Sequence, residues 1–160
     1  MPRGGCSAAP HAGYGTRMAL TKKERDRLPS TLARSPRKAQ ETYVHTLESA
    51  EKEHGDGEAA HRIALSSLKH SFEKVGDHWE PKAKRGPSDP QDAKSGPAAR
   101  RGRGTTPGGV DAYSSKVHLM EVAKRLDVKG RSRMKKDELV AAIDKANRTT
   151  SARSLRKERT

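Results

Sequence analysis

Basic side chains crowd into a short segment near the C-terminus, between two stretches with apolar residues at helical spacing. These cations are Lys124, Arg125, Lys129, Arg131, Arg133, Lys135 and Lys136. Each phosphate that such a cation contacts releases counterions, so affinity falls steeply with salt. Phosphate contacts position a protein without reading bases, which predicts sequence-tolerant binding to nucleic acid. The alternative, that these charges only keep a small module in solution, stays open.

A second candidate lies further upstream, where Arg101 and Arg103 flank a glycine. An Arg-Gly-Arg sequence is slim enough to enter a narrow A·T minor groove, where the potential is most negative. It is similar to the core of an AT-hook but lacks the flanking prolines. Ordinary charge in a linker is the simpler interpretation.

Catalytic and metal-binding patterns are poorly represented. His54, His61, His70 and His78 are seven to nine residues apart, whereas a helical metal site needs pairs three or four apart. Cys6 is the single cysteine, and no base has a fixed place beside it. We therefore expect no enzymatic activity, no catalytic residue, no metal site and no cofactor.

Composition limits the size of any core. The chain has 160 residues, 31% of them hydrophobic and 34% charged, with a net charge of +14. So polar a chain favours short modules over one continuous core. The chain has one cysteine and lacks a long apolar run and a secretory signal, which fits a cytoplasmic protein. Association with the nucleoid is compatible with this location. A translation start at Met18 instead of Met1 stays open.

Residues 28–80 carry apolar side chains at helical spacing in two stretches. The stripes consist of Ala39, Tyr43, Leu47 and Ala50, then of Ala60, Ala64, Leu68, Phe72 and Val75. Ser35 as a cap and Pro36 at the first helical position predict the start of the first helix. Gly76 should end the second helix, and Trp79 should fold back over the pair. The segment predicts a helical hairpin.

The C-terminal part repeats this logic on a smaller scale. Its stripes are Leu119, Val122, Ala123 and Leu126, then Leu139, Val140, Ile143 and Ala146. Ser114 or Ser115 can cap the first helix, and Ser132 can cap the second. The spacing predicts a helix, an extended loop and a helix.

The predicted fold is therefore all-α, with two small helical modules joined by a disordered linker. The remaining segments are a disordered basic N-terminal tail over 1–27, a disordered Pro/Gly/Arg-rich linker over 81–110, a second module over 111–148 and a frayed basic tail over 149–160. A flexible linker would leave the relative geometry of the modules free.

The first module resembles the ChaB family, small helical bacterial and viral proteins labelled cation transport regulators. The residues that carry the resemblance are Leu28, Pro29, Ser35, Pro36, Ala39, Gln40, Tyr43, Ser49, Ala50, Glu58, Ala60, His61, Ala64, Leu68, Lys69, Phe72, Lys74, Gly76, Asp77 and Trp79. The family tends to have an aromatic residue where Leu47 stands and a tryptophan near Glu51. The resemblance implies a helical fold and a role in cation transport.

The second module resembles the small helical domain at the N-terminus of transcription terminator Rho. The matching residues are Leu119, Val122, Ala123, Lys124, Leu126, Val128, Gly130, Ser132, Met134, Lys135, Lys136, Glu138, Leu139, Val140 and Ile143. The resemblance implies a helix–extended loop–helix unit, similar in plan to SAP-type DNA-binding modules. Rho reads RNA mainly through a neighbouring OB fold, whose strands have no counterpart here, and the chain has no phosphate loop of the motor type.

Our leading interpretation is a non-enzymatic, nucleic-acid-associated protein, and the resemblance suggests transcription termination or regulation as its setting. DNA is favoured over RNA because Tyr113 is the one aromatic residue near the cations. The slightly acidic module 28–80 would dock a protein partner or remain free. The alternative is a soluble regulator of a cation transporter, acting through protein contacts or through anionic lipid headgroups. A purely structural adaptor is the third option.

Overall fold

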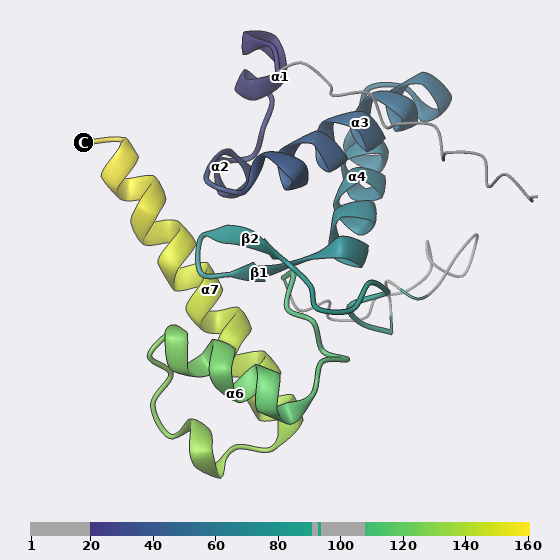
Figure 1. Ribbon diagram of the computed structural model, residues 1–160. Coiled ribbons are helices and arrows are strands. Elements are labelled where there is room, and N and C mark those ends of the chain that lie inside the picture. The colour runs from purple at the N-terminus through teal and green to yellow at the C-terminus, as the bar shows by residue number, and fades with distance from the viewer. Residues whose placement is uncertain (1–19, 91–92, 94–107) are drawn as a thin grey trace, which may run out of the picture.

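The computed structural model describes residues 20–90, 93 and 108–160, and helices dominate this part of the chain (Figure 1). The elements are α1 (Lys22–Asp26), α2 (Ser30–Ala33), α3 (Arg37–His54), α4 (Glu58–Ser71), β1 (Phe72–Val75), β2 (His78–Pro81), α6 (Lys116–Arg125), the 3-10 turn η1 (Arg131–Arg133) and α7 (Lys136–Glu158). The predicted all-α class is confirmed in that the structure is mostly helical, with the helical hairpin and the helix–extended loop–helix unit; the strands β1 and β2 were not predicted.

The first core lies between α3 and α4, which pack along the predicted stripes. Tyr43 and Leu47 of α3 meet Ala64 and Leu68 of α4, and all four side chains are buried. The Tyr43 hydroxyl forms a hydrogen bond of 2.8 Å with Nδ1 of His61, so the buried phenol keeps a polar partner. Periodicity alone was sufficient to predict this contact face.

The predicted second helix is too long by one turn. α4 ends at Ser71, and Phe72 begins a strand that pairs antiparallel with β2, with Val75 opposite His78. Gly76 turns the chain with a φ of 69°, a conformation that tight hairpin turns require and that glycine adopts without strain. Phe72 and Val75 fit the helical stripe in spacing, but aromatic and β-branched residues also favour strands.

The β1–β2 hairpin forms a layer with two different faces, because side chains alternate along a strand. Phe72 and Trp79 lie on the face that belongs to the first core. Val75 belongs to the second core, and Glu73 bonds to a residue of α6 on that same side. The hairpin therefore separates the two cores and contributes to both.

Ser35 has a different role from the predicted one. α3 has Pro36 as its N-cap residue and no side-chain cap. The Ser35 hydroxyl instead donates to the carbonyl of Thr31 (2.7 Å) and accepts from the backbone N–H of Trp79 (2.7 Å). Because Trp79 is buried, its N–H would otherwise lose a partner. Ser35 thus ties α2 to β2.

The second core is built as predicted from the facing stripes of α6 and α7. Leu119, Leu139 and Ile143 are fully buried in it, and Val110 joins them from the end of the linker. Ser115 caps α6 by accepting from the N–H of His118 (3.2 Å).

The predicted cap of the second helix is wrong. Ser132 lies within η1, and α7 begins after Lys135, whose N–H donates to the carboxylate of Glu138 (2.6 Å). A glutamate three residues into a helix can satisfy the backbone at its start, which removes the need for a serine cap.

Three segments expected to be irregular are ordered where the structure describes them. Leu20 joins the first core, and Thr21 caps α1, so the predicted disorder is wrong for residues 20–27. In the linker, Ser88 is buried, and its carbonyl accepts from the N–H of Ala112 in the second module (2.8 Å). Residues 149–158 continue α7 and are not frayed, because polar side chains of this helix bond to the hairpin. Arg101 and Arg103 lie outside the described residues.

The end of the linker packs so closely on the β1–β2 hairpin that adding a single methyl group at Gly109 tests the contact. Gly109 has a φ of +95°, and an added Cβ would lie 2.6 Å from Cη2 of Trp79 and 2.8 Å from Cβ of Lys74. Gly55 has a φ of +78°, but nothing lies within 4 Å of its would-be Cβ. Both substitutions to alanine introduce backbone strain, and only Gly109→Ala adds a clash.

We expect Gly109→Ala to lower the free energy of unfolding by about 1–3 kcal/mol more than Gly55→Ala does. Urea unfolding of the two variants, followed by circular dichroism, measures the difference. Equal losses would show that the linker end does not pack on the hairpin as described.

A candidate nucleic-acid interface on the C-terminal unit

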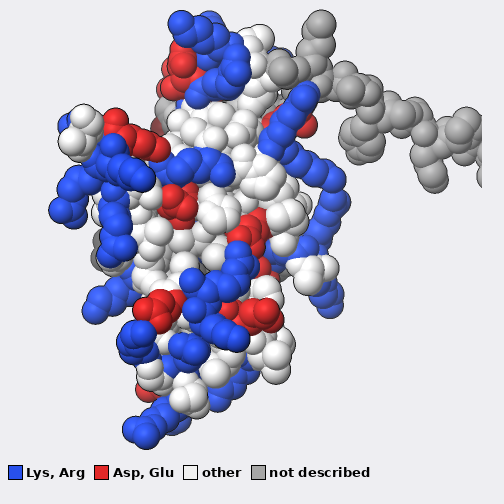
Figure 2. All heavy atoms as spheres, turned by 60° about the vertical axis from the view of Figure 1, so that its left-hand side comes forward, with Lys and Arg blue, Asp and Glu red and all other residues white. Residues whose placement is uncertain are grey.

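The cations predicted to bind phosphate lie at the end of α6, in the loop, on η1 and at the start of α7. Arg131 and Lys136 are half-buried, and the others, Lys124, Arg125, Lys129, Arg133 and Lys135, are exposed. Figure 2 shows basic side chains over the upper and lower parts of one face of the molecule, with acidic groups among them. The surface is therefore a mixed one, and the pairing of each cation decides what it can bind.

Three of these cations already have partners. Arg125 forms an ion pair with Glu80 of β2, in which Nη1 lies 2.9 Å from Oε2. Lys129 pairs with Asp127 at 2.7 Å, and Arg131 donates to the carbonyl of Val128 at 3.1 Å. The Arg125 guanidinium, through its hydrogen bond, holds the pKa of Glu80 below its ordinary value. Arg125 therefore joins the two halves of the molecule, which leaves it less free to bind a ligand.

The remaining exposed cations are free to bind anions. Lys124, Arg133 and Lys135 form no ion pair with any residue in the described ranges. Lys124 lies at the end of α6, Arg133 in η1 and Lys135 directly before α7. An exposed cation without an internal carboxylate can exchange its counterions for phosphates.

From Lys145 onward, α7 and its C-cap residue carry basic residues that were not among the predicted site residues. They are Lys145, Arg148, Arg153, Arg156, Lys157 and Arg159, and all are exposed. The side of α7 that packs inward carries Ile143, Asn147 and Ser151, and by helical spacing Lys145, Arg148 and Arg156 share the opposite side, the basic face of α7. Arg148 there forms an ion pair with Asp144. Continuing the helical spacing past residue 148 would have shown this face.

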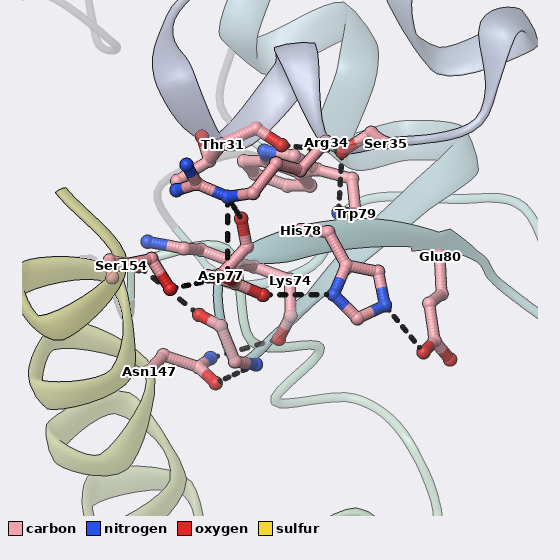
Figure 3. Close-up of polar contacts among 12 residues, drawn as sticks. Thr31, Arg34, Ser35, Lys74, Asp77, His78, Trp79, Glu80, Asn147 and Ser154 are labelled. Atoms are coloured by element: carbon pink, nitrogen blue, oxygen red, sulfur yellow. Dashed lines mark hydrogen bonds and ion pairs between the residues drawn. The ribbon is translucent and has the colours of Figure 1, made fainter. Parts of the chain in front are cut away.

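Polar contacts with the hairpin turn hold α7 in place (Figure 3). The side chain of Asn147 is buried. Its Oδ1 accepts from the N–H of Gly76 (2.6 Å), and its Nδ2 donates to the carbonyl of Lys74 (2.8 Å). One turn later, the Ser151 hydroxyl donates to the carbonyl of Gly76 (3.2 Å). These bonds satisfy the backbone groups of the turn, so α7 completes the hairpin.

Asp77 at the tip of the turn collects further partners from both halves (Figure 3). Its carboxylate accepts from the hydroxyl of Ser154 (2.6 Å) and lies 3.2 Å from Nε of Arg34 and 3.2 Å from Nδ1 of His78. Burial alone would raise the pKa of Asp77, but these hydrogen bonds and the charge of Arg34 outweigh it and lower the pKa. Arg34 also pairs with Glu158 near the end of α7.

The comparisons follow this division of the molecule. Residues 28–82 match the family model described as ChaB. Residues 117–148 match the one described as Rho termination factor, N-terminal domain. Both resemblances are confirmed. The chain matches no curated protein and no solved structure closely.

The β1–β2 hairpin belongs to the ChaB-like unit, whose match extends through residue 82. The helix α7 extends beyond the Rho-N-like match, and its added turns make the contacts with Asp77 and Arg34. The chain has thus joined its two units through residues at their edges.

Two other properties bear on function. The described residues contain no group of three or more histidine, cysteine or acidic side chains placed to hold a metal ion. Among the same residues, no helix combines the length and apolarity needed to span a bilayer.

The role of Asn147 can be measured. Asn147→Ala would leave the N–H of Gly76 and the carbonyl of Lys74 without their partners, at a cost of about 1–3 kcal/mol in the free energy of unfolding. Thr149→Ala is the control, because Thr149 is exposed on the same helix and bonds only to the carbonyl of Lys145. Urea unfolding should show a clear loss for the first variant and almost none for the second. A loss no larger than that of the control would contradict the role of Asn147.

The Glu80–Arg125 pair predicts a pH effect with a definite sign. The pKa of Glu80 is lower in the folded chain than its ordinary value of 4.5, so its carboxylate contributes stability above that pH. This contribution disappears as the pH falls through the lower, folded pKa. Glu80→Gln should therefore reduce the difference in unfolding free energy between pH 7 and pH 3.

The control is Glu121→Gln, which removes an exposed carboxylate on α6, the helix of Arg125. It should keep the pH dependence of the wild type in the same urea experiments. A Glu80→Gln variant with the full wild-type dependence would show that the pair contributes nothing.

Proposed function

We propose that the chain is a non-enzymatic nucleic-acid-binding protein whose Rho-N-like unit holds phosphates through its loop and through the basic face of α7. The observation that carries the proposal is the set of exposed cations, Lys124, Arg133 and Lys135, on an ordered loop and without internal ion pairs. The description of the matching family, which belongs to a termination factor, supports the same reading. Transcription termination or regulation is the setting it suggests.

The shape of the basic surface favours backbone contacts along a strand or duplex. α7 has 23 residues, which corresponds to a length of about 35 Å. This is close to one turn of B-form DNA. Charges on one face of such a rod can follow phosphates without reading bases, so binding should tolerate many sequences. We take duplex DNA as the first ligand to test, ahead of RNA.

The ChaB-like unit would contribute a protein-binding surface held at a fixed angle to the basic face. The alternative function is regulation of a cation transporter, in which the basic residues meet anionic lipid headgroups. The described part of the chain offers little apolar surface for a membrane. Its large exposed apolar side chains are Ile63, Tyr113, Val117 and Leu155, spread over separate elements. We therefore rank nucleic acid above lipid, and a cytoplasmic location is part of the proposal.

The test has to use the full chain. A division after residue 80 would cut β2, which ends at Pro81, and would take Val75 away from the second core. Full-length variants avoid this problem.

We expect the triple variant Lys124→Ala, Arg133→Ala, Lys135→Ala to bind duplex DNA more weakly than the wild type. The slope of log affinity against log salt should become shallower by about 0.9 for each phosphate that the variant no longer binds. Fluorescence anisotropy with a labelled 20-base-pair duplex, at several salt concentrations, measures both quantities.

The matched control removes the same charge from α1, through Lys22→Ala, Lys23→Ala and Arg25→Ala, three exposed residues that precede the ChaB-like unit. Its slope should stay close to that of the wild type. Equal effects in both triple variants would assign binding to net charge rather than to the loop. Binding to phosphatidylserine vesicles that is stronger than binding to duplex at equal salt would favour the transporter alternative.

A further inference from the structure

A cavity of about 400 Å³ opens between the β1–β2 hairpin and the start of α6. One wall is the linker segment 82–87, and the opposite wall is residues 113–115. Glu73 of β1 and His118 of α6 also line the cavity. Its volume lies within the usual range for sites that bind small molecules.

The linker wall is held rigidly by a buried lysine. The side chain of Lys82 is 2% exposed, and its ammonium group donates to the carbonyl of Gly86 (2.8 Å) and lies 3.1 Å from the carboxylate of Asp111. The N–H of Gly86 donates to the carbonyl of His70 at the end of α4 (2.8 Å). The loop closed by these bonds carries Lys84 and Arg85, which are exposed. The backbone that carries both cations is therefore fixed beside the cavity.

The two acidic residues of the cavity both have partners within the protein. Glu73 lies 2.7 Å from Nε2 of His118, and Asp111 pairs with Lys82. Asp111 also accepts from the N–H of Tyr113 (3.1 Å). Burial raises the pKa of Glu73. Lys84 and Arg85 form no ion pair with any residue that the structure describes, so both can offer their charge to a ligand at the cavity.

An exposed aromatic ring completes the lining. Tyr113 is 53% exposed, although its backbone is fixed by the bond to Asp111. Aromatic rings beside cations are the combination that holds unpaired bases, because the ring stacks on the base while the cations hold the phosphate. A paired base inside a duplex cannot stack on such a ring.

We propose that this cavity holds one unpaired nucleotide of a nucleic-acid strand, with the base against Tyr113 and its phosphate between Lys84 and Arg85. The proposal deepens the nucleic-acid function proposed above and rests on it. A single aromatic residue by itself gives little reason to expect binding of single strands. Here a cavity and two exposed cations lie beside Tyr113, and the three features together suit one unpaired nucleotide. Strands with unpaired nucleotides should gain a contact that duplexes lack.

The experiment compares the full-length wild type with Tyr113→Leu and Tyr113→Phe. Anisotropy measures binding of a labelled 16-nucleotide thymidine strand and of a duplex of the same length. Stacking of one base accounts for about 1–3 kcal/mol, so Tyr113→Leu should weaken single-strand binding about 5- to 150-fold and leave duplex binding unchanged. Tyr113→Phe keeps the ring and should bind like the wild type.

The cations are tested by Lys84→Gln with Arg85→Gln, against Lys22→Gln with Lys23→Gln as a control of equal charge. The first pair should weaken single-strand binding and reduce its salt slope by about 0.7 for each phosphate that is no longer bound, and the control should not. A strand that carries abasic sites should bind the wild type as weakly as the intact strand binds Tyr113→Leu.

The outcomes separate the two proposals. If Tyr113→Leu binds the single strand like the wild type, while the loop variant Lys124→Ala, Arg133→Ala, Lys135→Ala loses affinity, the cavity proposal is overturned and the nucleic-acid function stands. If the wild type binds neither strand nor duplex, both proposals fail. Selective loss with Tyr113→Leu and retention with Tyr113→Phe would establish the cavity as the site of the unpaired nucleotide.

Discussion

The fold depends on a hairpin of two short strands that serves two cores at once. Phe72 and Trp79 on one face close the space between α3 and α4, while Val75 on the other face joins the stripes of α6 and α7. A chain with so few apolar residues cannot complete two cores independently. Because the two cores share the side chains of the hairpin, each unit needs fewer apolar residues of its own. The consequence is that the ChaB-like and Rho-N-like units form one body.

The contact between the units is polar as well as apolar, which fixes their orientation. A buried polar group is costly unless bonded, and the amide of Asn147 meets one donor and one acceptor of the hairpin. In the same placement of α7, the hydroxyl of Ser154 also donates to the carboxylate of Asp77. A partner on the ChaB-like unit and a nucleic acid on α7 would therefore be held at a set angle, whereas a flexible linker between independent modules would allow any angle.

The sequence was sufficient to predict the contacts within each unit but not the contacts between the two units. The stripes of α3, α4, α6 and α7 follow helical periodicity, so their partners could be inferred. Phe72 continued such a stripe although it begins a strand, because four-residue spacing cannot distinguish a last helical turn from a strand. Nothing in the sequence indicated that Asn147 and Ser151 are buried. Their hydrogen-bond partners lie more than 70 residues away in the chain, and only the fold brings them close. The seven predicted cations were found by counting charge, but the pairing of Arg125 with Glu80 needed the fold.

Burial and pairing, more than position in the sequence, decide what each basic residue does. Lys82, from the segment predicted to be a disordered linker, is buried, bonds to carbonyls and a carboxylate, and shapes a loop. Arg125 neutralises a strand carboxylate and joins the units. Lys84 and Arg85, a few residues from Lys82, remain exposed on the loop it orders. A basic side chain that bonds to carbonyls or a carboxylate of the protein has already replaced its hydration water with protein partners. It therefore gains little from binding a phosphate. The net charge of +14 therefore overstates how many cations are available to bind a polyanion. The available ones are those that lie on ordered backbone and have no carboxylate partner.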